Sequence, residues 1–158
     1  MVSKVRVFDT EADGLLDTIT KIHILSYTED GETFHTTTDY DTMRKWLSEE
    51  GVLWVGHFAI GYDMPAINAV LGGGDFTAMT YKQFWDSMYV SWALFPERPK
   101  HGLEALGLEH GFPKVVVRED QWEEGDPVLM RERVERDVLI NYHEYIKQKK
   151  RLEEIYGT

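Results

Sequence analysis

The sequence predicts an α/β domain in which helices flank a mixed central sheet. The first third of the chain contains three β-like runs, at residues 4–9, 21–27 and 32–38, and Asp30-Gly31 forms a hairpin turn between the last two. The run from Val52 to Val55 is fully apolar, which is typical of a buried central strand. Three antiparallel strands followed by a helix and a buried strand indicate a layered domain with antiparallel and parallel pairs.

Helical patterns account for most of the other elements. Helices are expected over residues 40–50, 62–71 and 83–95, with a short helical turn over 102–106 and a long helix over 128–154. Asp39 or Asp41 caps the first of these helices, and Gly72-Gly73-Gly74 ends the second and predicts flexibility there. Residues 111–127 are rich in loop formers, with a small strand expected at 115–117.

The length and composition favour one globular domain that spans residues 1–158. Hydrophobic residues make up 42% of the 158 residues and aromatic residues 13%, which is enough for a core. There is no apolar run of membrane-spanning length and no signal-peptide pattern, so we expect no membrane association. The absence of cysteine excludes disulfides and thiolate metal sites, and a cytoplasmic location fits this composition.

The charge of the chain is strongly negative. Seventeen basic and 28 acidic residues give a formal net charge of −11. This is the wrong sign for a protein that holds nucleic acid mainly by counterion release. It suits an enzyme that concentrates carboxylates around metal ions, but it also suits a protein with no nucleic-acid partner.

Asp9 and Glu11 are the most informative residues. They follow the first strand run, and alternation of side chains along a strand places both carboxylates on one face. Two adjacent carboxylates repel each other, and a hard divalent cation such as Mg²⁺ relieves this repulsion. The pattern therefore indicates a metal platform for phosphoryl chemistry, or simply a solvated strand end.

Further polar residues follow along the chain. Asp63 comes after Gly56-His57, where it is either a helix N-cap or a site residue beyond a strand end. Asp137 lies in the last helix, beside its apolar face, and is either a metal ligand or the partner of Arg133 in a surface salt bridge. Asp86 is interpreted first as a helix cap. His101 is placed near a cleft or in a structural role.

The order of these residues resembles the DEDD, or DnaQ-like, superfamily of 3′–5′ exonucleases. The matching segments are Asp9-Thr10-Glu11-Ala12-Asp13-Gly14-Leu15-Leu16, Thr20-Lys21-Ile22-His23, His57 with Tyr62-Asp63-Met64-Pro65-Ala66, Asp86-Ser87, His101 to Gly107, and Asp137-Val138. The likeness spans residues 5 to about 148 and is closest to the proofreading domains of phage family A DNA polymerases. It implies a ribonuclease H-like fold.

The resemblance also implies a mechanism. Two divalent ions, Mg²⁺ or Mn²⁺, would clamp the scissile phosphate. Asp9 would bridge both ions, Glu11 and Asp137 would complete the first site, and Asp63 would hold the second ion. The residues implied to bind substrate are Leu15, His57, Phe58, Tyr62 and His101, although core packing explains Leu15, Phe58 and Tyr62 equally well.

The resemblance has one departure. The family places Tyr four residues before the last Asp, or His five residues before it, to activate the attacking water. Here these positions are Arg133 and Glu132, so the general base is unknown. Tyr142 and His143 lie at the wrong helical offset to replace it, and His101 is a speculative substitute.

The implied substrate is a single-stranded or frayed DNA 3′ end, in the cytoplasm of a bacterium or a phage-infected host. Lys100, Lys114, Arg118 and the cluster Lys147, Lys149, Lys150 and Arg151 are candidates to contact phosphates. No polymerase segment follows in the sequence, so we expect a free-standing exonuclease, or one that acts with a DNA polymerase in trans.

Three alternatives remain open at this point. The first is an exoribonuclease of the same superfamily, because carboxylate motifs do not distinguish DNA from RNA. The second is a binding or scaffold module that has lost turnover, which the missing Tyr or His favours and the four acidic residues disfavour. The third is an unrelated acidic α/β protein.

Overall fold

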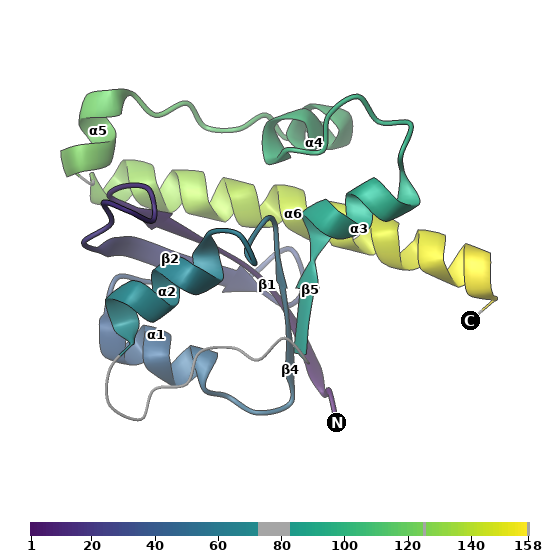
Figure 1. The fold of residues 1–158 in the computed structure, drawn as a ribbon, viewed down its shortest axis with the longest axis horizontal. Coiled ribbons are helices and arrows are strands. Elements are labelled where there is room, and N and C mark those ends of the chain that lie inside the picture. Colours follow the sequence, from purple (N-terminus) through teal and green to yellow (C-terminus); the bar gives the residue numbers. More distant parts are fainter. Residues whose placement is uncertain (73–82, 125, 158) are drawn as a thin grey trace.

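A computed structural model describes residues 1–72, 83–124 and 126–157 of the chain, apart from the side chain of Glu123. Figure 1 shows the elements, coloured along the sequence. The strands are β1 (Lys4–Ala12), β2 (Ile22–Thr28), β3 (Phe34–Thr37), β4 (Val52–Gly56) and β5 (Phe84–Asp86). The helices are α1 (Tyr40–Leu47), α2 (Asp63–Leu71), α3 (Ser87–Leu94), α4 (Leu103–His110), α5 (Glu119–Glu124) and α6 (Pro127–Tyr156).

The described strands form one sheet in the order β3-β2-β1-β4-β5. The pairs β1–β2 and β2–β3 are antiparallel, whereas β1–β4 and β4–β5 are parallel. The sheet is therefore mixed, as the sequence predicted. Because β1, β4 and β5 run in the same direction, their carboxyl ends meet at one edge, where α/β folds commonly bind ligands.

Helices cover both faces of the sheet. Phe8 of β1 belongs to a core cluster with Met43 of α1 and Ile67 of α2. The next residue back, Val7, belongs to a cluster with Val138 of α6. Figure 1 shows α6 running along one side of the sheet and α1 and α2 on the other. Alternation along β1 therefore assigns its odd-numbered residues to the α6 side.

Three sequence expectations differ from the structure. Residues 83–95 were expected to be one helix, but β5 pairs with β4 before α3 begins. Pairing with a distant strand overrides the local helical pattern here. The strand expected at residues 115–117 is wrong, because this segment is irregular, and α5 follows it without having been predicted. The turn at 102–106 is the start of the longer helix α4.

Other expectations agree with the structure. Asp39 caps α1, its side chain accepting a hydrogen bond from the Thr42 amide, and Asp86 likewise caps α3. Gly72 ends α2, while Gly73 and Gly74, where flexibility was predicted, lie outside the described residues. Within the described ranges, no helix combines the length and apolar character needed to cross a membrane.

Candidate active site

Three carboxylates meet where β1 passes under α6. Asp9 and Glu11 share the face of β1 that carries Val7, and α6 packs against this face. Asp137 projects from α6 beside Val138, which anchors the helix on the sheet. One carboxylate oxygen from each of the three acidic residues lies within 4.8 Å of the other two. Regular strand alternation and helix packing thus bring together residues more than 120 positions apart.

Asp63 approaches the other three carboxylates from the start of α2. It is the first residue of α2, and the N-cap is Tyr62, which makes no side-chain capping bond. The interpretation of Asp63 as a helix cap is therefore wrong. Its Oδ1 accepts a hydrogen bond of 2.5 Å from the Thr10 hydroxyl. Thr10 was not predicted as a site residue, because a Thr between two acids has no distinctive signal.

The four carboxylates and Thr10 line one cavity of about 230 Å³, which we call the acidic pocket. Its lining is Asp9, Thr10, Glu11, His57, Phe58, Tyr62, Asp63, Leu103, Lys114, Arg133 and Asp137. All four predicted carboxylates are present, together with three of the five residues predicted to bind substrate. Leu15, largely exposed after β1, and His101 are not among the lining residues.

The acidic pocket makes ionisation of its carboxyl groups difficult. Burial raises the pKa of Asp9 well above its ordinary value, and the nearby charges of Asp63 and Asp137 add to this rise. Burial also raises the pKa of Glu11 to about 8 and that of Asp63 to about 6. In each case, removing the carboxylate from water disfavours its charged form. The pocket therefore holds more acidic groups than its surroundings can stabilise as anions.

Two cationic side chains compensate part of this charge. Lys114 Nζ lies 3.5 Å from Asp137 Oδ2, and Arg133 Nε donates to Glu11 Oε1 at 3.2 Å. Arg133 also donates to the Val115 carbonyl at 2.6 Å and lies over the Trp122 ring, 4.5 Å from its centroid. The alternative in which Arg133 pairs with Asp137 in a surface salt bridge is therefore wrong, because Arg133 pairs with Glu11 of β1.

The donor set fits a divalent cation. Asp137 Oδ1 is buried and has no hydrogen-bond partner among the described residues. An unpaired buried carboxylate oxygen costs free energy, which a bound cation would remove. Carboxylate oxygens are also the ligands that Mg²⁺ and Mn²⁺ prefer.

His57 and Tyr62 are fixed by bonds to neighbouring segments. His57 Nδ1 lies 2.8 Å from Ser87 Oγ, and burial lowers the pKa of His57 to about 4. The imidazole is therefore neutral near pH 7. The Tyr62 hydroxyl donates to the Gly14 carbonyl at 2.5 Å, and burial raises the pKa of Tyr62 to about 12. Both rings are held as neutral groups in the pocket wall.

The His101 side chain is not among those that line the acidic pocket. Its Nδ1 is 2.7 Å from Ser91 Oγ on α3, and its ring meets Trp92 edge-on at 6.2 Å. His143 stacks on Phe112 at 4.9 Å, and neither His143 nor Tyr142 lines the acidic pocket. None of these three side chains is thus placed as a replacement for the missing Tyr or His.

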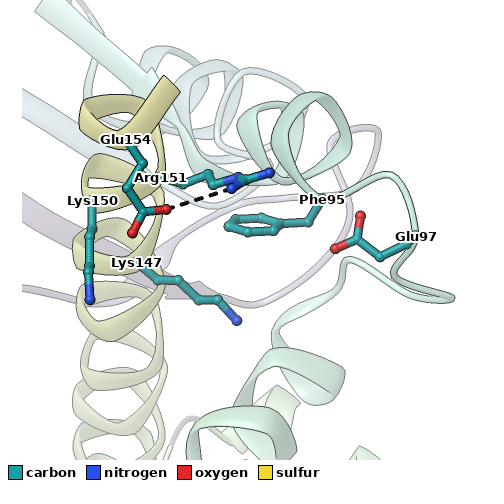
Figure 2. A pocket seen from close by; sticks show the side chains of 6 residues that line it. All are labelled: Phe95, Glu97, Lys147, Lys150, Arg151 and Glu154. Carbon is teal, nitrogen blue, oxygen red and sulfur yellow. Dashed lines mark ion pairs between the residues drawn. The ribbon is translucent and has the colours of Figure 1, made fainter. Parts of the chain in front are cut away.

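Three residues of the basic cluster near the chain end, Lys147, Lys150 and Arg151, line a second hollow, shown in Figure 2. Phe95, Glu97, Lys147, Lys150, Arg151 and Glu154 surround about 450 Å³ between the end of α3 and the last turns of α6. Arg151 lies 3.6 Å from Glu154, and Lys147 Nζ lies 3.1 Å from Glu109. Acidic partners therefore offset part of this positive charge.

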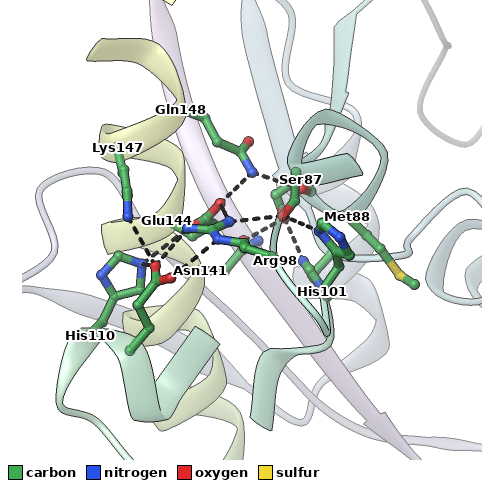
Figure 3. Close-up of polar contacts among 12 residues, drawn as sticks. Ser87, Met88, Arg98, His101, His110, Asn141, Glu144, Lys147 and Gln148 are labelled. Atoms are coloured by element: carbon green, nitrogen blue, oxygen red, sulfur yellow. Dashed lines mark hydrogen bonds and ion pairs between the residues drawn. The ribbon is translucent and has the colours of Figure 1, made fainter. Parts of the chain in front are cut away.

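A second group of polar side chains, centred on the buried Glu144, lies farther along α6 (Figure 3). We call it the Glu144 network, and its members are Arg98, Glu109, His110, Glu144 and Gln148. Arg98 donates to both oxygens of Glu144, at 2.7 and 2.9 Å, and also to Glu109. His110 Nε2 lies 3.0 Å from Glu144, and Gln148 donates to it at 2.7 Å. Sequence reasoning did not find this network.

Comparison with known proteins identifies the fold of this chain from solved structures. No protein-family model and no curated protein sequence matches the chain. Brucella melitensis NrnC with bound Mg²⁺ has a TM-score of 0.73 at 16% identity, over 98% of this chain and 76% of that chain. A structure described as the apo form of the nuclease has a TM-score of 0.69 at 16% identity, over 96% and 74%.

A polymerase gives a similar match. The family B DNA polymerase of the hyperthermophilic archaeon Pyrobaculum calidifontis has a TM-score of 0.66 at 16% identity, over 91% of this chain and 24% of the polymerase. The predicted closeness to family A proofreading domains is not supported by these matches. At such low identity the likeness concerns the fold. The chain has the α/β, ribonuclease H-like fold that its sequence predicted.

Proposed function

We propose that this protein is a metal-dependent 3′–5′ exonuclease of the DEDD type, which releases nucleoside monophosphates from single-stranded or frayed 3′ ends. The observation that carries the proposal is the acidic pocket, in which four carboxylates with raised pKa values face only two cationic side chains. The fold supports it, since one similar structure is Brucella melitensis NrnC bound to pGG, with a TM-score of 0.74 at 17% identity.

The carboxylates would hold two divalent ions, Mg²⁺ or Mn²⁺. Asp9, Glu11 and Asp137 present oxygens close enough to share one ion, and Asp63 faces the pocket from α2 to hold another. When bound, such ions supply positive charge that stabilises a phosphodiester during hydrolysis. Thr10 orients Asp63 through its hydrogen bond, and Lys114 adds positive charge beside Asp137.

The shape of the pocket favours a single-stranded end. The cavity is small, about 230 Å³, so a duplex end must unpair before its terminal nucleotide can enter. Phe58 and Tyr62 offer ring surfaces to a terminal base. We propose DNA as the substrate, with RNA as the alternative, and a cytoplasmic role beside a DNA polymerase, such as proofreading.

A 5′-labelled single-stranded DNA oligonucleotide tests this function, with a matching RNA in parallel. With Mg²⁺ or Mn²⁺ we expect a ladder that shortens from the 3′ end. EDTA and the variant Asp9→Asn should both abolish it. Asp41→Asn is the matched control, because Asp41 is an exposed acid on α1 that contacts Arg44. An intact oligonucleotide under every condition would overturn the proposal.

A second candidate is a nucleic-acid-binding module without turnover. The Arg133–Glu11 contact favours it, because an arginine there occupies one of the carboxylates. Calorimetric titration with Mn²⁺ separates the two candidates. The exonuclease should bind two ions, whereas a module without turnover should bind weakly or at a single site.

A further inference from the structure

A row of partly exposed aromatic side chains leads away from the acidic pocket. It begins at Phe58, which lines the pocket, and continues through Tyr89 and Trp92 of α3 to His101. Successive ring centroids are 6.5, 5.2 and 6.2 Å apart. The first three side chains are 42, 42 and 44% exposed, so each of these rings presents accessible surface.

The backbone holds Phe58 in an unusual conformation. Its φ is 54°, and no other non-glycine residue in the described ranges has a positive φ. For a bulky side chain this is a strained conformation, which persists only where the surroundings enforce it. Here Asp86 accepts hydrogen bonds from the amides of Phe58 and Ile60, at 2.9 and 3.1 Å. A Cβ at Gly61 would lie 2.4 Å from the Phe58 ring, so glycine leaves room for it.

The same carboxylate positions the other half of the row. Asp86 Oδ1 also accepts a hydrogen bond from the Met88 amide at 3.0 Å, which caps α3. Tyr89 and Trp92 lie three positions apart on this helix and therefore project from one face. One buried side chain thus fixes the strained loop with Phe58 and the helix with Tyr89 and Trp92 relative to each other.

We propose that Phe58, at the terminal base, begins a stacking track that continues over Tyr89, Trp92 and His101 for the bases that precede the 3′-terminal nucleotide. This inference rests on the proposed function and specifies its substrate as a single strand of several nucleotides. Continuity with the acidic pocket favours a nucleic acid over a protein partner. The net charge of −11 makes attraction of phosphates weak, so stacking has to supply much of the affinity.

Binding of single strands tests the track without requiring hydrolysis. The probes are 5′-fluorescein octathymidylate and octauridylate with phosphorothioate linkages, followed by anisotropy in the presence of Ca²⁺. Trp92→Leu should weaken binding about tenfold, since it keeps an apolar side chain but removes the ring. Trp92→Phe should stay within about threefold of the unchanged protein. Tyr156→Ala, which removes an exposed aromatic at the far end of α6, should have no effect.

Substrate length separates the track from the active site. Trp92→Leu should lower kcat/KM for an octanucleotide about tenfold while leaving hydrolysis of a dinucleotide unchanged, because a dinucleotide does not reach Trp92. If no substrate is cut but Trp92→Leu still weakens binding, the proposed function fails and the track stands. If binding is unchanged in Trp92→Leu, or if this variant instead dissociates an oligomer in sedimentation, the track is wrong.

Discussion

The acidic pocket and the Glu144 network both bury carboxylates on α6, only two helical turns apart, yet they handle the charge in opposite ways. Burial by itself raises the pKa of Glu144, but hydrogen bonds from His110 and Arg98 lower it to about 2. Burial raises the pKa of Asp137, and contact with Lys114 only partly offsets this rise. One carboxylate is fully compensated within the chain, and the other is not.

This difference distinguishes a compensated structural cluster from the proposed cation site. Glu109, His110 and Glu144 also bring three possible metal-ligand atoms within 4.8 Å, as the acidic pocket does. Arg98 already occupies the centre of that cluster with a permanent positive charge. Ligand spacing alone therefore does not identify a metal site, and the supply of internal cations must be considered with it.

The largest expected effect comes from removing a charge from the acidic pocket. Asp137→Asn keeps the shape of the side chain but removes a ligand, so the rate of hydrolysis should fall on the order of a thousandfold or more. Its metal-free stability should hold or rise, because a buried charge disappears. Single-turnover hydrolysis and urea denaturation measure the two effects. A loss below tenfold would contradict the role of Asp137.

The matching change in the Glu144 network should have the opposite result, a loss of stability without a loss of hydrolysis. Glu144→Gln leaves Arg98, 7% exposed, without its main partner. Breaking a buried ion pair costs about 3–5 kcal/mol, and the remaining contact with Glu109 favours the lower end. Urea denaturation measures this loss, while hydrolysis per folded molecule should stay near that of the unchanged protein. A loss below about 1 kcal/mol would mean that the network contributes little.

The stability of the metal-free protein should change with pH in opposite directions through the two groups of carboxylates. Folding raises the pKa of Glu11 from 4.5 to about 8, so the folded state binds more protons and stability falls as pH rises across this window. Folding lowers the pKa of Glu144 from 4.5 to about 2, so stability is lost as pH falls below 4.5. Thermal unfolding at several pH values should therefore show Mg²⁺ raising Tm at pH 8 but hardly at pH 5. A uniform Mg²⁺ effect would place the ion elsewhere.

Much of the fold could be predicted because its signals are local. Strand alternation placed Asp9 and Glu11 together, and the apolar run at Val52 to Val55 indicated the buried strand β4. By contrast, β5 exists because Phe84 and Trp85 pair with β4, which no local pattern in residues 83–95 reveals. The prediction of helix or strand failed where pairing with a distant strand decided the structure of a segment.

The contacts that define the site were harder to predict than its acidic residues. Arg133 and Glu11 are 122 positions apart, and their contact depends on how α6 is rotated over β1. Asp86 could be predicted as a cap from its place before α3, but its bonds to Phe58 and Ile60 depend on a loop with a positive φ. Partners of a buried polar group follow from packing in three dimensions, which the order of residues does not state.

The smallest expected effect tests whether internal cations compete with the bound ion. Arg133→Gln removes the partner of Glu11, so Mn²⁺ affinity should rise about fivefold, on the order of 1 kcal/mol. Arg131→Gln is the matched control, because Arg131 is an exposed arginine of the same helix whose pair with Glu135 should contribute little. Calorimetry should find a change below twofold for this control. Weaker Mn²⁺ binding in Arg133→Gln would mean that Arg133 orients Glu11 for the ion instead of competing with it. The acidic pocket and the Glu144 network would then differ more in the geometry of their cationic side chains than in how much of the carboxylate charge these side chains offset.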